Sequence, residues 1–212
     1  MTSEPTTTRI ADGTADVVSA LARSGDPQRL TALHDRLAEQ ADRAGALDVA
    51  YRTIDSPVGE LLLAATGRGL VRVAYVREDH EQVLATIADQ VSPRVLRAPA
   101  RLDPAASELD EYFAGRRRTF DLVLDMQLAR GFSRAVLDQL ARIGYGATES
   151  YAAIATKAGR PAAVRAVGNA CARNPLPLVV PCHRVVRSDG SLGGYAGGPD
   201  AKRALLSLEA AG

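Results

Sequence analysis

The chain has 212 residues, enough for one large or two small domains with a proper core. Its formal net charge is only +1, but residues 131–212 hold ten Lys and Arg against five Asp and Glu, whereas residues 1–130 hold 16 against 20. The two cysteines form no short-spaced pair, which argues against a disulfide framework or a zinc site, and no apolar segment is long enough to span a membrane. We expect a cytoplasmic protein without a metal or cofactor, whose basic C-terminal part suits contact with phosphates.

Residues 1–45 are predicted to be a polar extension. Residues 1–25 are small and polar, and residues 1–9 contain no hydrophobic signal core. Asp26-Pro27 is a typical helix start, an N-cap residue followed by proline in the first turn, and the helix should run to about Ala44. The apolar residues that share one face of this helix are Leu30, Leu33, Leu37 and Ala41. We expect that face to pack on the core or on a partner.

Residues 46–127 are predicted to form a small α+β domain. Strands are indicated over 51–54, 60–65, 71–76 and 120–124, and helices over 80–91 and 104–113. The second and third strands are joined by the turn Thr66-Gly67-Arg68-Gly69. No acidic cluster with clear spacing indicates hydrolysis here, so this domain is expected to support the one that follows.

Residues 128–212 begin with three predicted helices. The first covers 133–143, Ser150 caps a second that runs to Ala158, and after the turn Gly159-Arg160-Pro161 a third covers 162–173. The small residues that make the third helix thin are Ala162, Ala163, Ala166, Gly168 and Ala170. A helix-turn-helix with a thin last helix suits close approach to a narrow DNA groove. The alternative is a small bundle of three short helices.

Cys182 lies in the pentapeptide Pro181-Cys182-His183-Arg184-Val185, directly after an apolar run. A lone cysteine with a histidine and a carboxylate or amide elsewhere is the outline of an activated thiolate. Because neighbouring side chains on a strand point to opposite faces, we expect His183 to reach Cys182 through a water, oriented by Glu209 or Asn174. The alternative is that Cys182 is a small buried hydrophobe, as free cysteines usually are.

Several separated motifs, in order and at workable spacing, carry a family resemblance. They are Tyr145-Gly146-Ala147-Thr148, Ser150-Tyr151, Gly159-Arg160-Pro161, Arg165-Ala166-Val167-Gly168, Asn174-Pro175, Pro181 to Val186, Gly193 to Gly198, Lys202 and Glu209. This part of the chain resembles the C-terminal domain of the O6-alkylguanine-DNA alkyltransferases, also called methylated-DNA–protein-cysteine methyltransferases. The resemblance runs from about Phe132 to Glu209, is weaker over 48–130, and is absent from the first 45 residues.

The resemblance implies both a fold and an activity. The fold would be α+β, with a small ribonuclease H-like N-terminal domain followed by a helix-turn-helix, winged-helix-like domain that binds DNA and carries out catalysis. The activity would be direct-reversal repair: double-stranded DNA bound through its minor groove gives up a flipped O6-alkylguanine. The alkyl group passes irreversibly to Cys182, so each protein molecule acts once. The protein is expected to be a monomer that associates with the bacterial nucleoid when bound to DNA.

The resemblance also implies roles for individual residues. Arg165 would fill the gap left by the extruded nucleotide, and Tyr151 would crowd that nucleotide's phosphate and donate toward the base. Glu209 would orient His183, which would deprotonate Cys182 through a water. Further DNA contacts are implied for Arg160, Ala163, Ala166 and Gly168. The base pocket is implied to contain the loop of Tyr195, Ala196 and Gly197, together with Tyr151 and the Val185 carbonyl.

The chain departs from its relatives at four positions, which are Ser133, Leu137, Gly144 and Ala196. The first three alter helix packing and a turn, and Ala196 removes one side-chain donor that some relatives supply as Ser. The alternatives from other classes of protein are a non-repairing lesion sensor, a transcriptional regulator and a Cys–His hydrolase. Cys182 argues against the lesion sensor, because the reactive cysteine is replaced in such relatives. The lack of cysteines before Cys171 argues against the regulator, and the helix that carries Arg165 has no role in a hydrolase. Alkyl-size preference, activity on alkylated thymine, cooperativity on DNA, and the roles of residues 1–45 and Cys171 stay open.

Overall fold

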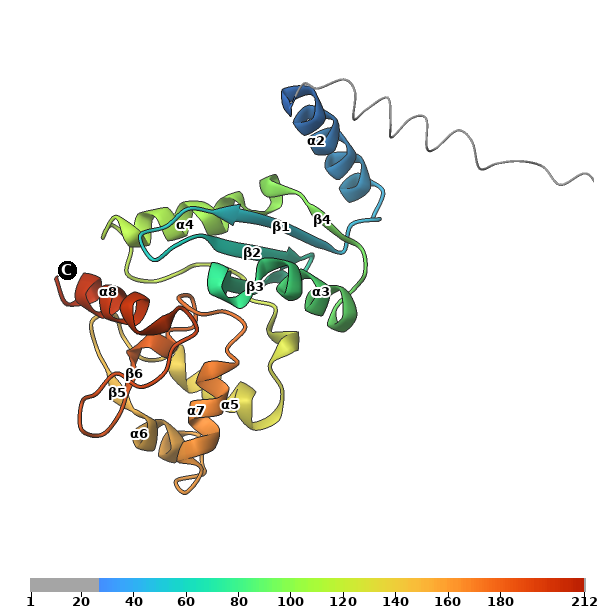
Figure 1. Ribbon diagram of the computed structural model, residues 1–212. Coiled ribbons are helices and arrows are strands. Elements are labelled where there is room, and N and C mark those ends of the chain that lie inside the picture. Colours follow the sequence, from blue (N-terminus) through green and yellow to red (C-terminus); the bar gives the residue numbers. More distant parts are fainter. Residues whose placement is uncertain (1–26, 212) are drawn as a thin grey trace, which may run out of the picture.

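A computed structural model describes residues 27–211 (Figure 1). The predictions for residues 1–25, and for Asp26 as a helix cap, lie outside the described residues. The first elements are α2 (Pro27–Arg43), β1 (Val49–Ile54), β2 (Leu61–Thr66), β3 (Gly69–Tyr75), α3 (His80–Gln90), β4 (Val95–Arg97) and α4 (Asp103–Phe113). They are followed by α5 (Gly131–Leu140), β5 (Glu149–Ser150), α6 (Tyr151–Lys157), α7 (Val164–Ala172), β6 (Val185–Val186) and α8 (Gly198–Ala210).

The N-terminal domain is a four-stranded sheet in the order β3-β2-β1-β4, with helices on both faces (Figure 1). β1 and β4 are parallel, and the other neighbours are antiparallel. Side chains alternate along β2, so Leu62 and Ala64 pack toward Val83 and Ile87 of α3. The residues of β2 that alternate with them, Leu61, Leu63 and Ala65, face a second, larger core that includes α4. This second core continues into the C-terminal domain.

The edge strand β3 carries much of the contact between the two domains. The backbone N–H of Val73 donates to the carbonyl of Pro175, at 2.8 Å, in the segment that precedes Cys182. One guanidinium nitrogen of Arg72 also donates to the carbonyl of Asn174, at 3.3 Å. Side chains of β2, β3 and α4 form one continuous buried cluster with those of α5, α6, α7 and α8. The sheet therefore supports the segment that leads to Cys182.

The C-terminal domain has the predicted helix-turn-helix. Ser150 caps α6, because its side-chain oxygen accepts a hydrogen bond from the N–H of Ala153 at 3.1 Å. α6 and α7 are separated by a turn in which Gly159 has φ +75°, a left-handed conformation that glycine adopts without strain. α5 packs behind them, with Val136, Leu137 and Leu140 buried.

The structure differs from the predicted local structure in three places. Residues 120–124 form no strand: they run extended over the core and make a single bridge, between Leu124 and Leu70. Phe120, Leu122 and Leu124 pack on the core, and only two backbone hydrogen bonds, both with Leu70, join the segment to β3. β4 was missed because three residues are too few to show alternation. The third helix begins at Val164 rather than at residue 162, because Ala162 belongs to the turn that follows Pro161.

Helix α2 forms where it was predicted but packs differently. Its buried contact is made by Ala38, which lies against Leu47, Ala50 and Ala98. His34 Nε2 also donates to the carbonyl of Arg97, at 2.9 Å. The leucines of the predicted face are 45–55% exposed and are Leu30, Leu33 and Leu37. These three leucines do not pack on the core of the described residues, whereas Ala41, the fourth residue of the predicted face, is half-buried against the cluster that contains Ala38.

Candidate active site and DNA-binding surface

The segment between α7 and β6 is held by Asn174. Its side-chain nitrogen donates to the carbonyl of Val180 at 2.8 Å, and its side-chain oxygen accepts from the N–H of Leu176 at 3.0 Å. Within this segment Leu178 has φ +73°, a conformation that is strained for a residue other than glycine. The backbone here is therefore fixed in one path, which ends at the cysteine.

Cys182 opens a 3-10 turn, Cys182–Arg184, and does not lie on a strand. The sequence-based argument that Cys182 and His183 point to opposite faces of a strand is therefore wrong. The thiol is 2% exposed. Burial raises the pKa of Cys182 to about 11, while a hydrogen bond with Asn174 and the positive charge of Lys202 act in the opposite direction. The sulfur is thus a protonated thiol at neutral pH, and a base has to remove its proton before it can attack.

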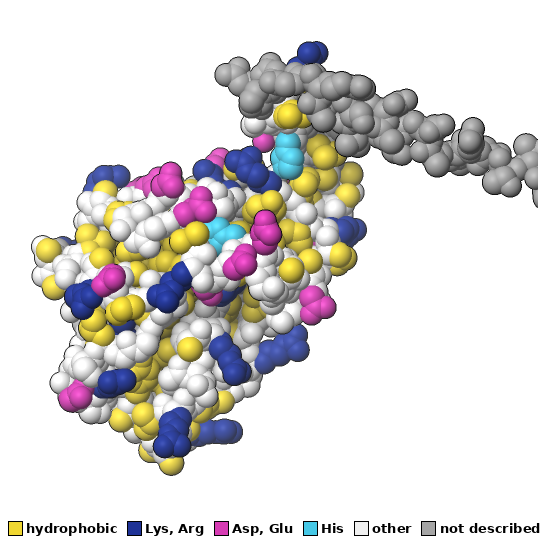
Figure 2. Space-filling model, in the orientation of Figure 1, with side chains coloured by type: hydrophobic (Ala, Val, Ile, Leu, Met, Phe, Trp, Pro, Cys, Tyr) yellow, Lys and Arg dark blue, Asp and Glu magenta, His cyan; other side chains and the backbone are white. Residues whose placement is uncertain are grey.

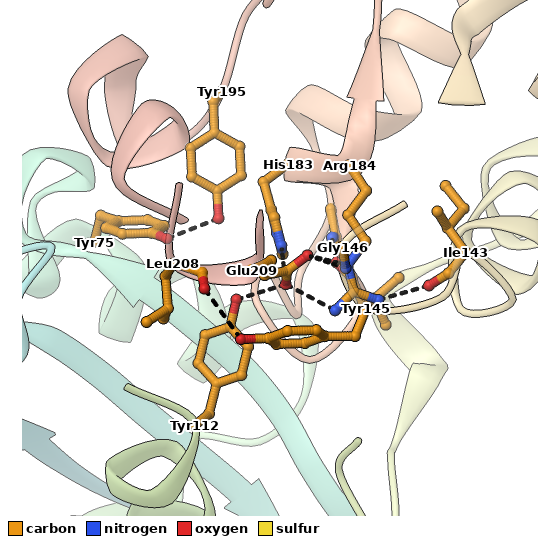
Figure 3. Close-up of polar contacts among 12 residues, drawn as sticks. Tyr75, Tyr112, Ile143, Tyr145, Gly146, His183, Arg184, Tyr195, Leu208 and Glu209 are labelled. Carbon is orange, nitrogen blue, oxygen red and sulfur yellow. Dashed lines mark hydrogen bonds and ion pairs between the residues drawn. The ribbon is translucent and has the colours of Figure 1, made fainter. Parts of the chain in front are cut away.

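His183 is fixed by Glu209, which reaches it from the last turn of α8 (Figure 3). The distance from His183 Nε2 to Glu209 Oε1 is 2.9 Å, and both side chains are buried. Burial lowers the pKa of His183, against the opposing effect of Glu209, so the imidazole is neutral at rest. Since the ionised carboxylate only accepts, the proton must be on Nε2. The basic lone pair is then on Nδ1, which is buried and has no hydrogen-bond partner among the described residues.

Glu209 accepts several other hydrogen bonds (Figure 3). Arg184 donates from Nε to Oε2 and from Nη2 to Oε1, each at 2.8 Å. The Tyr112 hydroxyl donates to Oε1 at 2.7 Å, and the N–H of Gly146 donates to Oε2 at 3.2 Å. Burial alone would raise the pKa of Glu209, but the donors, led by His183 and Arg184, hold it well below its usual range. The carboxylate therefore stays ionised at the bottom of the site.

Two members of this network were not predicted from the sequence. Arg184 lies in the cysteine motif, but no role was predicted for it, because the sequence does not indicate that it is buried against Glu209. Tyr112 comes from α4 of the N-terminal domain, 97 residues away from Glu209. No spacing rule connects two residues so far apart in the sequence.

Lys202 is a third unpredicted member of the site. It lies on α8, is fully buried, and donates from Nζ to the carbonyl of Val185 at 2.6 Å and to the carbonyl of Leu192. Burial lowers its pKa, opposed by the thiols of Cys182 and Cys171. Lys202 thus supplies a buried positive charge near the sulfur. Lys202 also occupies one lone pair of the Val185 carbonyl, the group for which a contact with guanine was expected.

A cavity of about 620 Å³ lies beside α7 and brings together residues that the sequence placed at the DNA and the base. Five of its lining residues were predicted, and these are Tyr151, Arg165, Gly168, Tyr195 and Ala196. Arg187 also lines it and was not predicted. Arg187 could have been predicted to contact DNA, because it is an arginine two residues after Val185 in the basic C-terminal part of the chain. On the face shown in Figure 2, Lys and Arg outnumber Asp and Glu over the C-terminal domain.

The other residues predicted to contact DNA, and Gly197 of the predicted base pocket, do not line this cavity. Ala163 and Ala166 are at the first turn of α7, beside Arg165. The Arg160 guanidinium carbon lies 5.2 Å from the centre of the Phe132 ring, a cation–π contact at the turn between α6 and α7. Gly197 faces Tyr75 of the N-terminal domain instead of the cavity.

Within residues 27–211 no cluster of three metal-binding side chains occurs. None of the helices in that range combines the length and the hydropathy needed to cross a bilayer.

Two family models match this chain, and both describe 6-O-methylguanine DNA methyltransferases. The ribonuclease-like domain matches residues 49–126, and the DNA-binding domain matches residues 131–211. Together these matches define a two-domain protein with a ribonuclease-like unit followed by a DNA-binding unit. The chain belongs to the 6-O-methylguanine DNA methyltransferase family.

Individual relatives agree with this assignment. The methylated-DNA–protein-cysteine methyltransferase of Mycobacterium tuberculosis is 41% identical over 159 residues, which are 75% of this chain and 91% of the relative. The constitutive enzyme of Bacillus subtilis is 41% identical over 160 residues, 75% of this chain and 94% of the relative. A crystal structure of the M. tuberculosis O6-methylguanine methyltransferase superposes with a TM-score of 0.67 over 77% of this chain and 93% of that one. The M. tuberculosis OGT in complex with DNA gives 0.65 over 76% and 93%, at 41% identity.

Proposed function

We propose that this protein repairs DNA by transferring the alkyl group of O6-alkylguanine to its own Cys182. The observation that carries the proposal is the buried pair of His183 and Glu209 next to Cys182, in a chain of this family. A histidine whose tautomer is set by a carboxylate, beside a thiol of raised pKa, is an arrangement for removing a proton during a reaction. Neither a purely structural cysteine nor a DNA-binding role requires it.

DNA is proposed to bind across α7 and the cavity beside it. Arg165 and Arg187 are exposed cations at that cavity, positioned to meet phosphates or the space left by a flipped nucleotide. Flipping costs a few kcal/mol and is easiest for a damaged, poorly paired base. Since Cys182 is 2% exposed and does not line the cavity, the base must displace part of the loop that carries Tyr195 to reach the sulfur.

The chemical step transfers one alkyl group and conserves protons. The thiol proton passes from Cys182 to His183 Nδ1, directly or through a water, and the imidazolium is stabilised by Glu209. A bond forms between the sulfur and the alkyl carbon while the bond from that carbon to O6 breaks. The electron pair goes to guanine, which takes up one proton, while the imidazolium gives up the one it received, so guanine and His183 both return to their neutral forms. The product thioether is stable, so one protein molecule repairs one lesion.

Repair and its dependence on the site can be measured with a duplex that contains one O6-methylguanine in a restriction site. Wild-type protein should restore cleavage up to one equivalent. Cys182→Ser should bind the duplex without restoring cleavage, and Cys171→Ser should retain repair as the matched control.

The role of His183 is tested separately with His183→Ala. This substitution should slow repair by roughly 10²–10⁴-fold, the usual contribution of general base catalysis, and leave DNA affinity nearly unchanged. An equal loss of repair and of DNA binding would contradict the relay.

A further inference from the structure

The loop beside the proposed alkyl-acceptor site is fastened to the N-terminal domain. The hydroxyl groups of Tyr195, in this loop, and Tyr75, on β3, lie 2.7 Å apart in a hydrogen bond (Figure 3). Their rings meet edge to face with centroids 5.6 Å apart. Tyr75 belongs to the domain for which the sequence indicated support only, yet it touches the loop that lines the proposed base pocket.

Two glycines let the loop approach this closely. A Cβ atom at Gly197 would lie 2.7 Å from the ring of Tyr75, which is closer than real side chains come. Gly198 has φ +87° and lies against the guanidinium of Arg77. Residues with side chains at these positions would hold the loop away from the domain. The close fit is therefore a specific docking of the loop on β3.

Tyr75 is a rigid anchor for the loop. It is 2% exposed, and its backbone N–H donates to Glu78 Oε1 at 2.9 Å. Glu78 is in turn paired with Arg72. On the other side of the contact, the Tyr195 ring lies 6.1 Å from the ring of His183. Tyr195 thus lies between Tyr75, which is fixed on the sheet, and His183, the proposed general base.

The hydroxyl pair is costly to separate. Burial raises the pKa of both Tyr75 and Tyr195, so neither hydroxyl ionises at neutral pH and each can serve the other as a hydrogen-bond partner. If the loop opened, the Tyr75 hydroxyl would lose this partner at a buried position. The closed loop is therefore favoured over the open loop by about the free energy of one hydrogen bond.

We propose that Tyr75 is a positioning residue that latches the Tyr195 loop over Cys182 and thereby limits the size of alkyl group that is accepted. The proposal rests on the proposed function, because it concerns access to the same sulfur. Removal of the Tyr75 hydroxyl should weaken the latch by about fivefold, the factor that corresponds to a hydrogen bond of about 1 kcal/mol. Larger groups need a wider opening, so they should gain more than methyl does.

The first test measures access to Cys182 without DNA. Wild-type protein and Tyr75→Phe are treated with iodoacetamide, and the labelling rates of the Cys182 and Cys171 peptides are followed by mass spectrometry. Cys182 should label about fivefold faster in the variant, while the rate at Cys171, which is buried on α7, should rise much less. An unchanged Cys182 rate, or an equal rise at both cysteines, would overturn the latch.

The second test measures alkyl size with duplexes containing O6-methylguanine or O6-benzylguanine. The ratio of benzyl to methyl transfer should rise about fivefold in Tyr75→Phe, and adding Tyr195→Phe should raise it no further. Tyr51→Phe is the matched control, because Tyr51 packs on the opposite face of the sheet. A ratio that matches wild type would overturn the proposal. Faster Cys182 labelling without any alkyl transfer by wild type would support the latch and refute the proposed repair function.

Discussion

Replacing Glu209 with Gln should destabilise the protein through a single buried group. The carboxylate accepts hydrogen bonds from His183, Arg184, Tyr112 and the N–H of Gly146. Gln keeps the shape but removes the charge and replaces one acceptor oxygen by a donor. Arg184 would then remain as a buried cation without its anion. Breaking a buried ion pair from one side typically costs about 3–5 kcal/mol.

The same substitution should change the pH dependence of stability. The pKa of Glu209 is lowered on folding, so its contribution is complete above the unfolded value of about 4.3 and is lost as the pH falls toward the folded value. The difference between wild type and Glu209→Gln should therefore shrink by about 1.4 kcal/mol for each pH unit below about 4.3. Other acidic groups are common to both proteins and cancel in the difference.

The measurement is urea unfolding followed by far-ultraviolet circular dichroism, from pH 7 down to pH 3. Glu39→Gln is the matched control, because Glu39 is paired with Arg43 on the exposed side of α2 and should change stability by about 0.5 kcal/mol or less. A loss below about 1 kcal/mol for Glu209→Gln at pH 7 would refute the reasoning. It would mean that desolvation of the carboxylate offsets its hydrogen bonds.

Three further predictions concern the DNA-binding surface. Arg165→Ala should lower the rate of repair in duplex DNA far more than it lowers transfer from the free base O6-benzylguanine, and equal losses would contradict a role in flipping. Arg187→Ala should weaken binding of any duplex and reduce the slope of log affinity against log salt by about 1, so an unchanged slope would exclude a phosphate contact. Gly193→Ala should slow repair, because the new Cβ would lie 2.7 Å from the Tyr151 hydroxyl at a backbone φ of +67°, whereas Gly194→Ala, with open space around it, should repair at the wild-type rate.

Elements with a strong periodic pattern were predictable from the sequence. Helices α3 and α4 and strands β1 to β3 lie within two residues of the predicted bounds, and α5 begins two residues and ends three residues earlier than predicted. The exceptions have physical causes. Residues 120–124 alternate because one side packs on the core, and alternation alone does not distinguish a paired strand from an extended segment. Cys182 was placed on a strand because the apolar run before it has strand composition, but Pro181 and the Asn174 contacts turn the chain.

The reactive part of the site was predictable where residues lie in one motif and unpredictable where they converge. Cys182, His183 and Glu209 were identified from local sequence together with the family resemblance. The burial of Arg184 and Lys202 was missed, because these residue types are usually exposed unless a partner is known. Tyr112 and Tyr75 were missed because they approach from the other domain. The N-terminal domain is thus part of the site itself, through one hydroxyl on Glu209 and another on the Tyr195 loop.

The central claim is that Cys182 itself receives the alkyl group. It is tested most directly by mixing the purified protein with an excess of a short duplex that contains one O6-methylguanine, then weighing the intact protein and its Cys182 peptide. The account predicts a gain of one methyl group per protein, confined to Cys182, with no further gain when more duplex is added. Binding of the duplex without any gain in mass, or a methyl group on Cys171 instead, would contradict it.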